Sequence, residues 1–165
     1  MLNRLGLLLA ALALGALLVN TQARACECGR IAEPREACNQ ADSVFTGTVV
    51  SIEDHVTWWR NAWIRLHNWV ADEKLCASSE SWVKDCGFEI TLTIDESLKG
   101  AKGPTVTVRT GRGGGDCAYP FQTGKRYLVY ANRYPTGELT TNRCDRTRPV
   151  ENAADDLSAL KLLFD

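Results

Sequence analysis

The segment 88-FEITLTI-94 decides the fold, because every second residue from Phe88 to Ile94 is apolar and the residues between are polar. This alternation has the period of a β-strand with one face in the core. The pattern stops at 97-SLKG-100. The sequence therefore predicts a half-buried strand here and a fold built mainly from β-structure.

Four further strands are predicted from runs rich in β-branched and aromatic residues. They cover 44–52, the neighbourhood of Val106 and Val108, 127–131 and 138–141, with a turn signal at 135–137. A short helix is expected within 32–42, where Pro34 suits a first helical position. A terminal helix over 150–164 places six apolar residues on one face. Five short strands plus a terminal helix predict a small barrel that is closed or nearly closed.

Residues 53–87 interrupt the strand pattern and are interpreted as an insertion between the first two strands. A helical stripe within it steps by three and four residues through Val56, Trp59, Trp63, Leu66 and Val70. We expect this stripe to dock the helix on the barrel. Trp58 and Trp69 lie off the stripe and are candidates for partner contact, since exposed tryptophans are costly unless a partner covers them.

The first 25 residues have the three parts of a secretory signal peptide. Arg4 precedes an apolar run from Leu5 to Val19, and the small-residue pattern 23-ARA-25 follows. Cleavage there makes Cys26 the first residue of the mature chain. A lipoprotein signal also ends at a cysteine, but Arg24 and a polar stretch before it disfavour lipid attachment. The run is short for a membrane span, so we expect a protein exported to the periplasm or the extracellular space.

The mature chain of 140 residues, 26–165, is the length of a single domain. Loss of Arg4 and Arg24 leaves 17 basic and 20 acidic residues, a net charge of −3. That balance argues against nucleic-acid binding, which requires a basic surface. All seven cysteines lie in the mature part. Disulfides are expected in an exported chain, and an odd number leaves at least one thiol free or paired outside the chain.

Enzymatic chemistry finds little support in the residues. The two histidines, His55 and His67, lack the spacing of a zinc-binding helix and leave little for nucleophilic catalysis. The glycine-rich stretch 111–115 is not followed by Gly-Lys-Ser/Thr, so it is not a phosphate loop. We expect a protein that is not an enzyme and holds no cofactor or metal ion of its own.

Several motifs together resemble the tissue inhibitors of metalloproteinases and, more broadly, the netrin-like domain. The most specific is 26-CEC-28 at the mature start, with Cys38 ten residues on. The others are 98-LKG-100, 116-DC-117, 127-YLV-129 and 141-TNRC-144. The resemblance spans about residues 26–160 apart from the insertion, and it implies an OB-type barrel stapled by disulfides.

The resemblance also implies a disulfide map. Cys26 pairs with Cys117, and Cys28 pairs with Cys144. Family members bond the third cysteine to one near the end of the domain, but no cysteine follows Cys144 here. We expect Cys76 to pair with Cys86 and Cys38 to be the odd thiol, with a bond from Cys38 into the insertion as the alternative.

In this family the mature N-terminus inhibits zinc metalloproteases. The resemblance implies that the Cys26 amine and carbonyl oxygen chelate the target's catalytic zinc in place of its water, with residues 26–28 forming the protease-binding tip. Glu27 is a departure, because inhibitors carry a compact residue there. A carboxylate entering a dry site is costly unless it meets a basic group or is protonated. The alternative is a solvated charge on an exposed tip.

The competing function is a netrin-like module that does not inhibit proteases and binds a protein or glycan through the tryptophan-bearing insertion. An oligonucleotide-binding barrel is disfavoured by charge and compartment. For either of the two leading functions we expect a monomer. Adding one residue before Cys26 separates them, because it converts the amine to an amide and leaves the insertion intact.

Overall fold

The computed structural model describes residues 26–54, 56–71, 75–76, 86–113 and 116–164. The predicted signal peptide lies outside these residues. So do His55, Gly114, Gly115 and the loop between Cys76 and Cys86. Among the helices that are described, none is long and apolar enough to cross a membrane.

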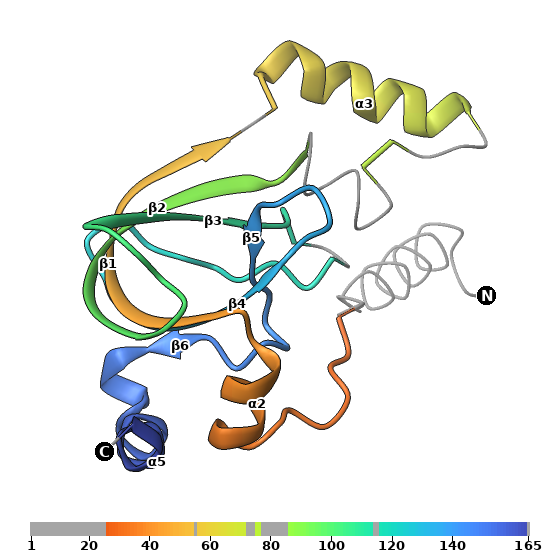
Figure 1. The fold of residues 1–165 in the computed structure, drawn as a ribbon. Coiled ribbons are helices and arrows are strands. Elements are labelled where there is room, and N and C mark those ends of the chain that lie inside the picture. Colours follow the sequence, from red (N-terminus) through yellow and green to blue (C-terminus); the bar gives the residue numbers. More distant parts are fainter. Residues whose placement is uncertain (1–25, 55, 72–74, 77–85, 114–115, 165) are drawn as a thin grey trace, which may run out of the picture.

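Five strands of the described chain close into a mixed β-barrel, and one short strand extends it (Figure 1). In barrel order they are β1 (Ser43–Asp54), β2 (Phe88–Lys99), β3 (Thr105–Thr110), β5 (Leu139–Thr140) and β4 (Arg126–Arg133). β4 pairs back onto β1 and closes the barrel, and β6 (Arg148–Pro149) lies outside β4. Of the strand pairs in the described residues, only β3 and β5 run parallel. The prediction of a closed, five-stranded OB-like barrel is confirmed.

Closure depends on the bending of β1, which pairs with β2 and with β4 over the same residues. Three register shifts interrupt its pairing with β2, one of them between Thr46 and Gly47. Such bulges bend a strand and increase its twist. A Cβ at position 47 would lie 2.6 Å from the Thr93 carbonyl oxygen, so only glycine fits the close approach at this corner.

Two apolar clusters lie on opposite faces of the barrel wall that β1 and β4 form. One fills the interior and includes Phe45, Leu92 and Val129. The other lies between the outside of β1 and β4 and the helices, and it includes Val44, Leu128 and Leu160. β1 and β4 are therefore buried on both faces, which explains why they appear in the sequence as continuous apolar runs. β2 has one solvent face and alternates.

Helices α2 (Pro34–Gln40) and α5 (Ala154–Phe164) pack against each other on this covered side (Figure 1). Pro34 stands at the start of α2, as predicted. The Lys99 Nζ atom donates to the carbonyl oxygens of Cys38, Asn39 and Ala41, at 2.8, 3.2 and 2.6 Å. A cation at the carbonyl end of a helix is favourable, so the 98-LKG-100 motif fixes α2 to the barrel.

Element boundaries depart modestly from the sequence prediction. β2 ends at Lys99, within the 97–100 segment where its end was predicted. β5 is shorter than predicted, and β6 was not predicted because two residues carry no periodicity. A 3-10 turn, Val150–Asn152, precedes α5. On the apolar face predicted over 150–164, Leu160 of α5 and Ala153, which precedes α5, are buried.

The insertion contains a helix as predicted, α3 (Trp58–Val70), between β1 and β2. The prediction that its tryptophan stripe docks on the barrel is wrong, because Trp59 and Trp63 are 60% and 54% exposed. The buried residue of α3 is Ile64, which packs with Val56 and Cys86. The periodicity predicted the apolar face of α3 correctly. It did not predict that a different face of the helix, the one with Ile64, packs against the rest of the protein.

Candidate functional site

The N-terminal tip, residues 26–28, is fastened to the barrel by two disulfides. Cys26 bonds Cys117 with a Cα–Cα distance of 5.1 Å, and Cys28 bonds Cys144 at 5.3 Å. The two bridges join residues 91 and 116 positions apart in the sequence. Glu27 lies between them and is exposed. The tip is thus a segment outside helices and strands that is held at both of its cysteines.

The two bridges converge. The sulfur atoms of Cys26, Cys117 and Cys144 lie within 4.8 Å of one another. These three are the only group of potential metal ligands among the described residues, and all of them are in disulfides, so they offer no thiolate to an ion. The two neighbouring disulfides therefore hold the tip at one place on the barrel.

The Cys117 loop is ordered by Asp116. Its carboxylate accepts hydrogen bonds from the backbone N–H groups of Arg112, Gly113 and Ala118, at 2.7, 2.8 and 3.1 Å. A Cβ at Gly111 would collide with this carboxylate, which explains the glycine. Cys117 itself adopts a left-handed backbone with φ 55°. Asp116 therefore holds a strained turn in the shape that presents the Cys117 sulfur.

The Cys144 loop is ordered in the same way and joined to the first. The Asp145 carboxylate accepts from the Asn142 N–H at 2.8 Å, and the Asn142 side chain accepts from the Cys144 N–H at 2.7 Å. Burial raises the pKa of Asp145, partly offset by that backbone hydrogen bond. A β-bridge pairs Ala118 with Asn142, and the Arg143 N–H donates to the Cys117 carbonyl at 2.8 Å. The loops that anchor the tip, residues 116–118 and 142–145, thus form one hydrogen-bonded unit, which we call the platform.

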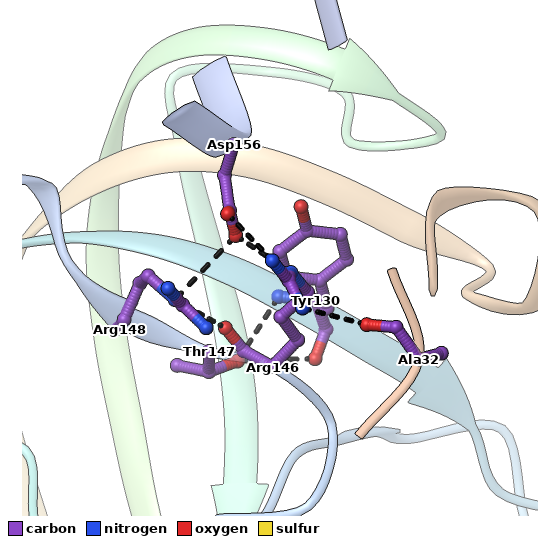
Figure 2. A network of polar contacts seen from close by, with 6 residues as sticks. All are labelled: Ala32, Tyr130, Arg146, Thr147, Arg148 and Asp156. Carbon is purple, nitrogen blue, oxygen red and sulfur yellow. Dashed lines mark hydrogen bonds and ion pairs between the residues drawn. The ribbon is translucent and has the colours of Figure 1, made fainter. Parts of the chain in front are cut away.

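An arginine that the sequence analysis did not single out fastens the chain just after the tip (Figure 2). Arg146 makes a two-pronged ion pair with Asp156 of α5, both contacts at 2.9 Å, and donates to the Ala32 carbonyl at 2.7 Å. Arg148 reaches the same carboxylate at 3.4 Å. The hydrogen bond to Asp156 raises the pKa of Arg146, so this guanidinium stays charged. Residues 26–32 are therefore held at both ends.

Beneath Arg146, Thr141 and Thr147 bind the backbone of β4. Both hydroxyls donate to the Tyr130 carbonyl oxygen, at 2.8 and 3.2 Å, and lie 2.8 Å apart. Both threonines are buried. These hydrogen bonds connect the platform to strand β4 of the barrel.

A hollow of about 280 Å³ opens beside the platform. Its walls include the aromatic rings of Phe88, Tyr119 and Phe121 and the side chains of Arg112 and Arg143. The Arg112 guanidinium lies 4.9 Å from the centre of the Phe88 ring and is paired with Asp54. The surface next to the tip is thus apolar with a basic edge.

The remaining candidate residues lie apart from the tip. Cys76 pairs with Cys86, and Cys38 is free and buried in α2, as we expected for these three cysteines. The pairings of Cys26 and Cys28 are those that the resemblance implies. Burial raises the pKa of the Cys38 thiol, and Lys99 opposes that effect. Trp58 and Trp69 are 84% and 82% exposed on α3, which lies beyond the end of β1 at the top of Figure 1.

Fold and site together define a disulfide-stapled OB-like barrel that presents a tethered N-terminal segment. No known protein-family model matches this chain, and no curated protein matches it significantly.

Proposed function

We propose that the mature protein is exported and inhibits a zinc metalloprotease, with the Cys26 amine and carbonyl oxygen chelating the protease's zinc. The observation that carries the proposal is the double tether: adjacent disulfides at Cys26 and Cys28 converge on one hydrogen-bonded platform. Three disulfides accord with an oxidising compartment. Signal-peptide cleavage after Ala25 provides the free amine.

Preorganisation is the physical reason for the tether. A free chain end frays, and its ordering on binding costs free energy that weakens a complex. A tip held at Cys26, Cys28 and Ala32 is ordered before it binds. The Cys26 sulfur is in a disulfide, so only the backbone amine and carbonyl are left as ligands. The amine must be unprotonated, and with an ordinary pKa of about 7.7–8.0 inhibition weakens as the pH falls.

Glu27 defines the class of target. Its side chain is exposed on the tip and would enter the protease's specificity pocket beside the zinc. A protease with a basic group in that pocket compensates the carboxylate, whereas an apolar pocket does not. The proposed target is therefore a metalloprotease with a basic specificity pocket.

The test compares the chain that begins at Cys26 with one that carries an additional alanine before it. Both are assayed against zinc metalloproteases with basic and with apolar pockets. The native start should inhibit the basic-pocket enzymes, and the extension should weaken inhibition at least about 100-fold, because the lone pair of an amide nitrogen is delocalised into its carbonyl group and does not bind zinc. An alanine added after Asp165 is the matched control. Equal inhibition by both N-termini would refute chelation.

Glu27→Gln sharpens the test. It should weaken inhibition of a basic-pocket protease and strengthen that of an apolar-pocket protease, since it removes the charge at nearly constant shape. A binding module without inhibition is the second candidate, and the exposure of Trp58 and Trp69 favours it. Such a module would lose nothing when Cys26 is extended.

A further inference from the structure

Helix α3 presents a wide apolar face to solvent. At about 100° per residue, one continuous arc of about 140° contains seven residues. In order around the helix they are Trp58, Trp69, Ala62, Leu66, Trp59, Val70 and Trp63. All seven are exposed, and the six large ones are 54–84% exposed. Exposed apolar surface of this extent marks an interaction site.

The borders of this arc are basic. Arg65 adjoins it on one side, and His67 and Arg60 adjoin it on the other, while the helix Trp58–Val70 contains no aspartate or glutamate. Asp54, the acidic residue of β1 nearest the helix in sequence, is paired with Arg112. The charged side chains of the helix itself are thus all basic, whereas Asp72 and Glu73 follow it in the sequence and the mature chain carries a net charge of −3.

Other residues of the insertion hold α3 on the face opposite the arc. Ile64 packs with Val56 and Cys86, and the Asn68 side chain exchanges two hydrogen bonds with the backbone of Leu75, at 2.9 and 2.7 Å. The arc therefore faces away from its attachment, and Figure 1 shows α3 at one end of the barrel and outside its strands. A flat surface could reach all of the arc at once.

We propose that this α3 face binds the surface of a bilayer that contains anionic phospholipid. Helices that lie in a membrane interface combine a tryptophan- and leucine-rich face with basic residues at its edges. Indole rings favour that depth because the ring is apolar and its N–H still reaches water. Trp58 and Trp69 lie near the two ends of a helix about 20 Å long, so both ends are anchored.

The width of the face favours lipid over a protein groove. A helix that inserts into a groove uses a narrow stripe of anchors at i, i+3 or i+4, and i+7. Here the apolar arc covers more than a third of the circumference and carries a basic residue on each side. Arginine at the edge adds attraction to anionic headgroups, which decays within a Debye length.

The test uses the full mature chain and flotation with two kinds of vesicle: equimolar phosphatidylglycerol and phosphatidylcholine, and phosphatidylcholine alone. The chain should float with the anionic vesicles, with a blue shift of tryptophan emission, and binding should weaken with added salt. Trp58→Gln with Trp69→Gln should weaken binding at least about tenfold, since affinity scales with buried apolar area. Arg65→Gln should weaken it less.

The matched control is Leu162→Gln, which removes an apolar side chain 70% exposed on α5. It should leave vesicle binding unchanged, and all variants should keep the urea midpoint of the native chain. Absence of binding to anionic vesicles at low salt, or full binding by the double tryptophan variant, would overturn the proposal. A dimer in sedimentation that the double variant dissociates would assign the face to a second copy of the chain and would overturn it equally.

Discussion

The N-terminal tip and the α3 insertion are attached to the same barrel in opposite ways. The tip has no apolar cluster of its own, yet two disulfides and Arg146 fix it to both sides of a hydrogen-bonded platform. α3 has thirteen residues and is held by the small cluster around Ile64. Covalent crosslinks thus order a short segment that packing alone would leave disordered. A helix with few buried residues, by contrast, relies on contacts outside the barrel for its stability.

The largest expected effect on stability comes from removing a disulfide that holds the tip. Cys28→Ser with Cys144→Ser opens a crosslink between residues 116 positions apart, which should lower the free energy of unfolding by about 5 kcal/mol in the chain-entropy description. Cys76→Ser with Cys86→Ser opens a crosslink of only 10 positions, for which the same description gives about 3 kcal/mol. Urea unfolding of both double variants measures the difference. A larger loss at the insertion would reverse the comparison.

Core truncation compares the two regions by packing. Phe45→Ala removes a fully buried ring from the barrel interior and should cost about 3–5 kcal/mol of global stability. Ile64→Ala should cost the barrel less than about 1 kcal/mol, because α3 can open locally while the barrel stays folded. Hydrogen exchange should then show faster exchange of the α3 amides alone. Uniformly faster exchange throughout the barrel would show that the insertion is part of the cooperative core.

Arg146 tests whether the tip is also held without disulfides. Arg146→Met leaves Asp156, which is 1% exposed, with only the longer contact to Arg148, and should cost about 3 kcal/mol. The control is Arg126→Met, which breaks the ion pair with Asp95 on the surface and should cost less than about 1 kcal/mol. Equal losses in thermal unfolding would mean that the Arg146 network contributes no more than a surface pair.

The smallest effect at neutral pH concerns the tyrosines. Burial raises the pKa of Tyr119 to about 12 and also raises that of Tyr127. A folded-state pKa above the unfolded value of about 10 means that the folded protein binds the proton more tightly. The stability that the buried, protonated tyrosines contribute is fully present below pH 10 and is lost as the pH rises from there toward 12. Absorbance titration should show delayed ionisation of these tyrosines until the barrel unfolds.

The sequence predicted the barrel because its signals are local. Alternation in β2 and the continuous apolar runs of β1 and β4 report how many faces of each strand are buried. The orientation of α3 was not predictable, since a stripe of Trp59 and Trp63 states that a face exists and not which surface lies against it. The long-range polar contacts of Arg146 carry no periodic signature at all, because Asp156 and Ala32 meet it only through the fold.

The candidate site was predictable in part. Cys26 and Cys28 stand out by their position after the predicted signal peptide, and the pairing with Cys117 and Cys144 came from resemblance rather than from spacing. The platform that joins these two loops was missed. Its capping residues Asp116 and Asp145 are adjacent to cysteines, and an Asx residue beside a cysteine in a loop is the signal that could have indicated it.

The central claim is that the exported chain begins with an unmodified Cys26 amine held by disulfides. Intact mass and N-terminal sequencing of the exported protein, with and without alkylation under denaturing conditions, measure this directly. The expected result is a chain that starts at Cys26, carries no acyl group and takes up one alkyl group, at Cys38. A different first residue, a fatty acid on Cys26, or more than one reactive thiol would contradict the account.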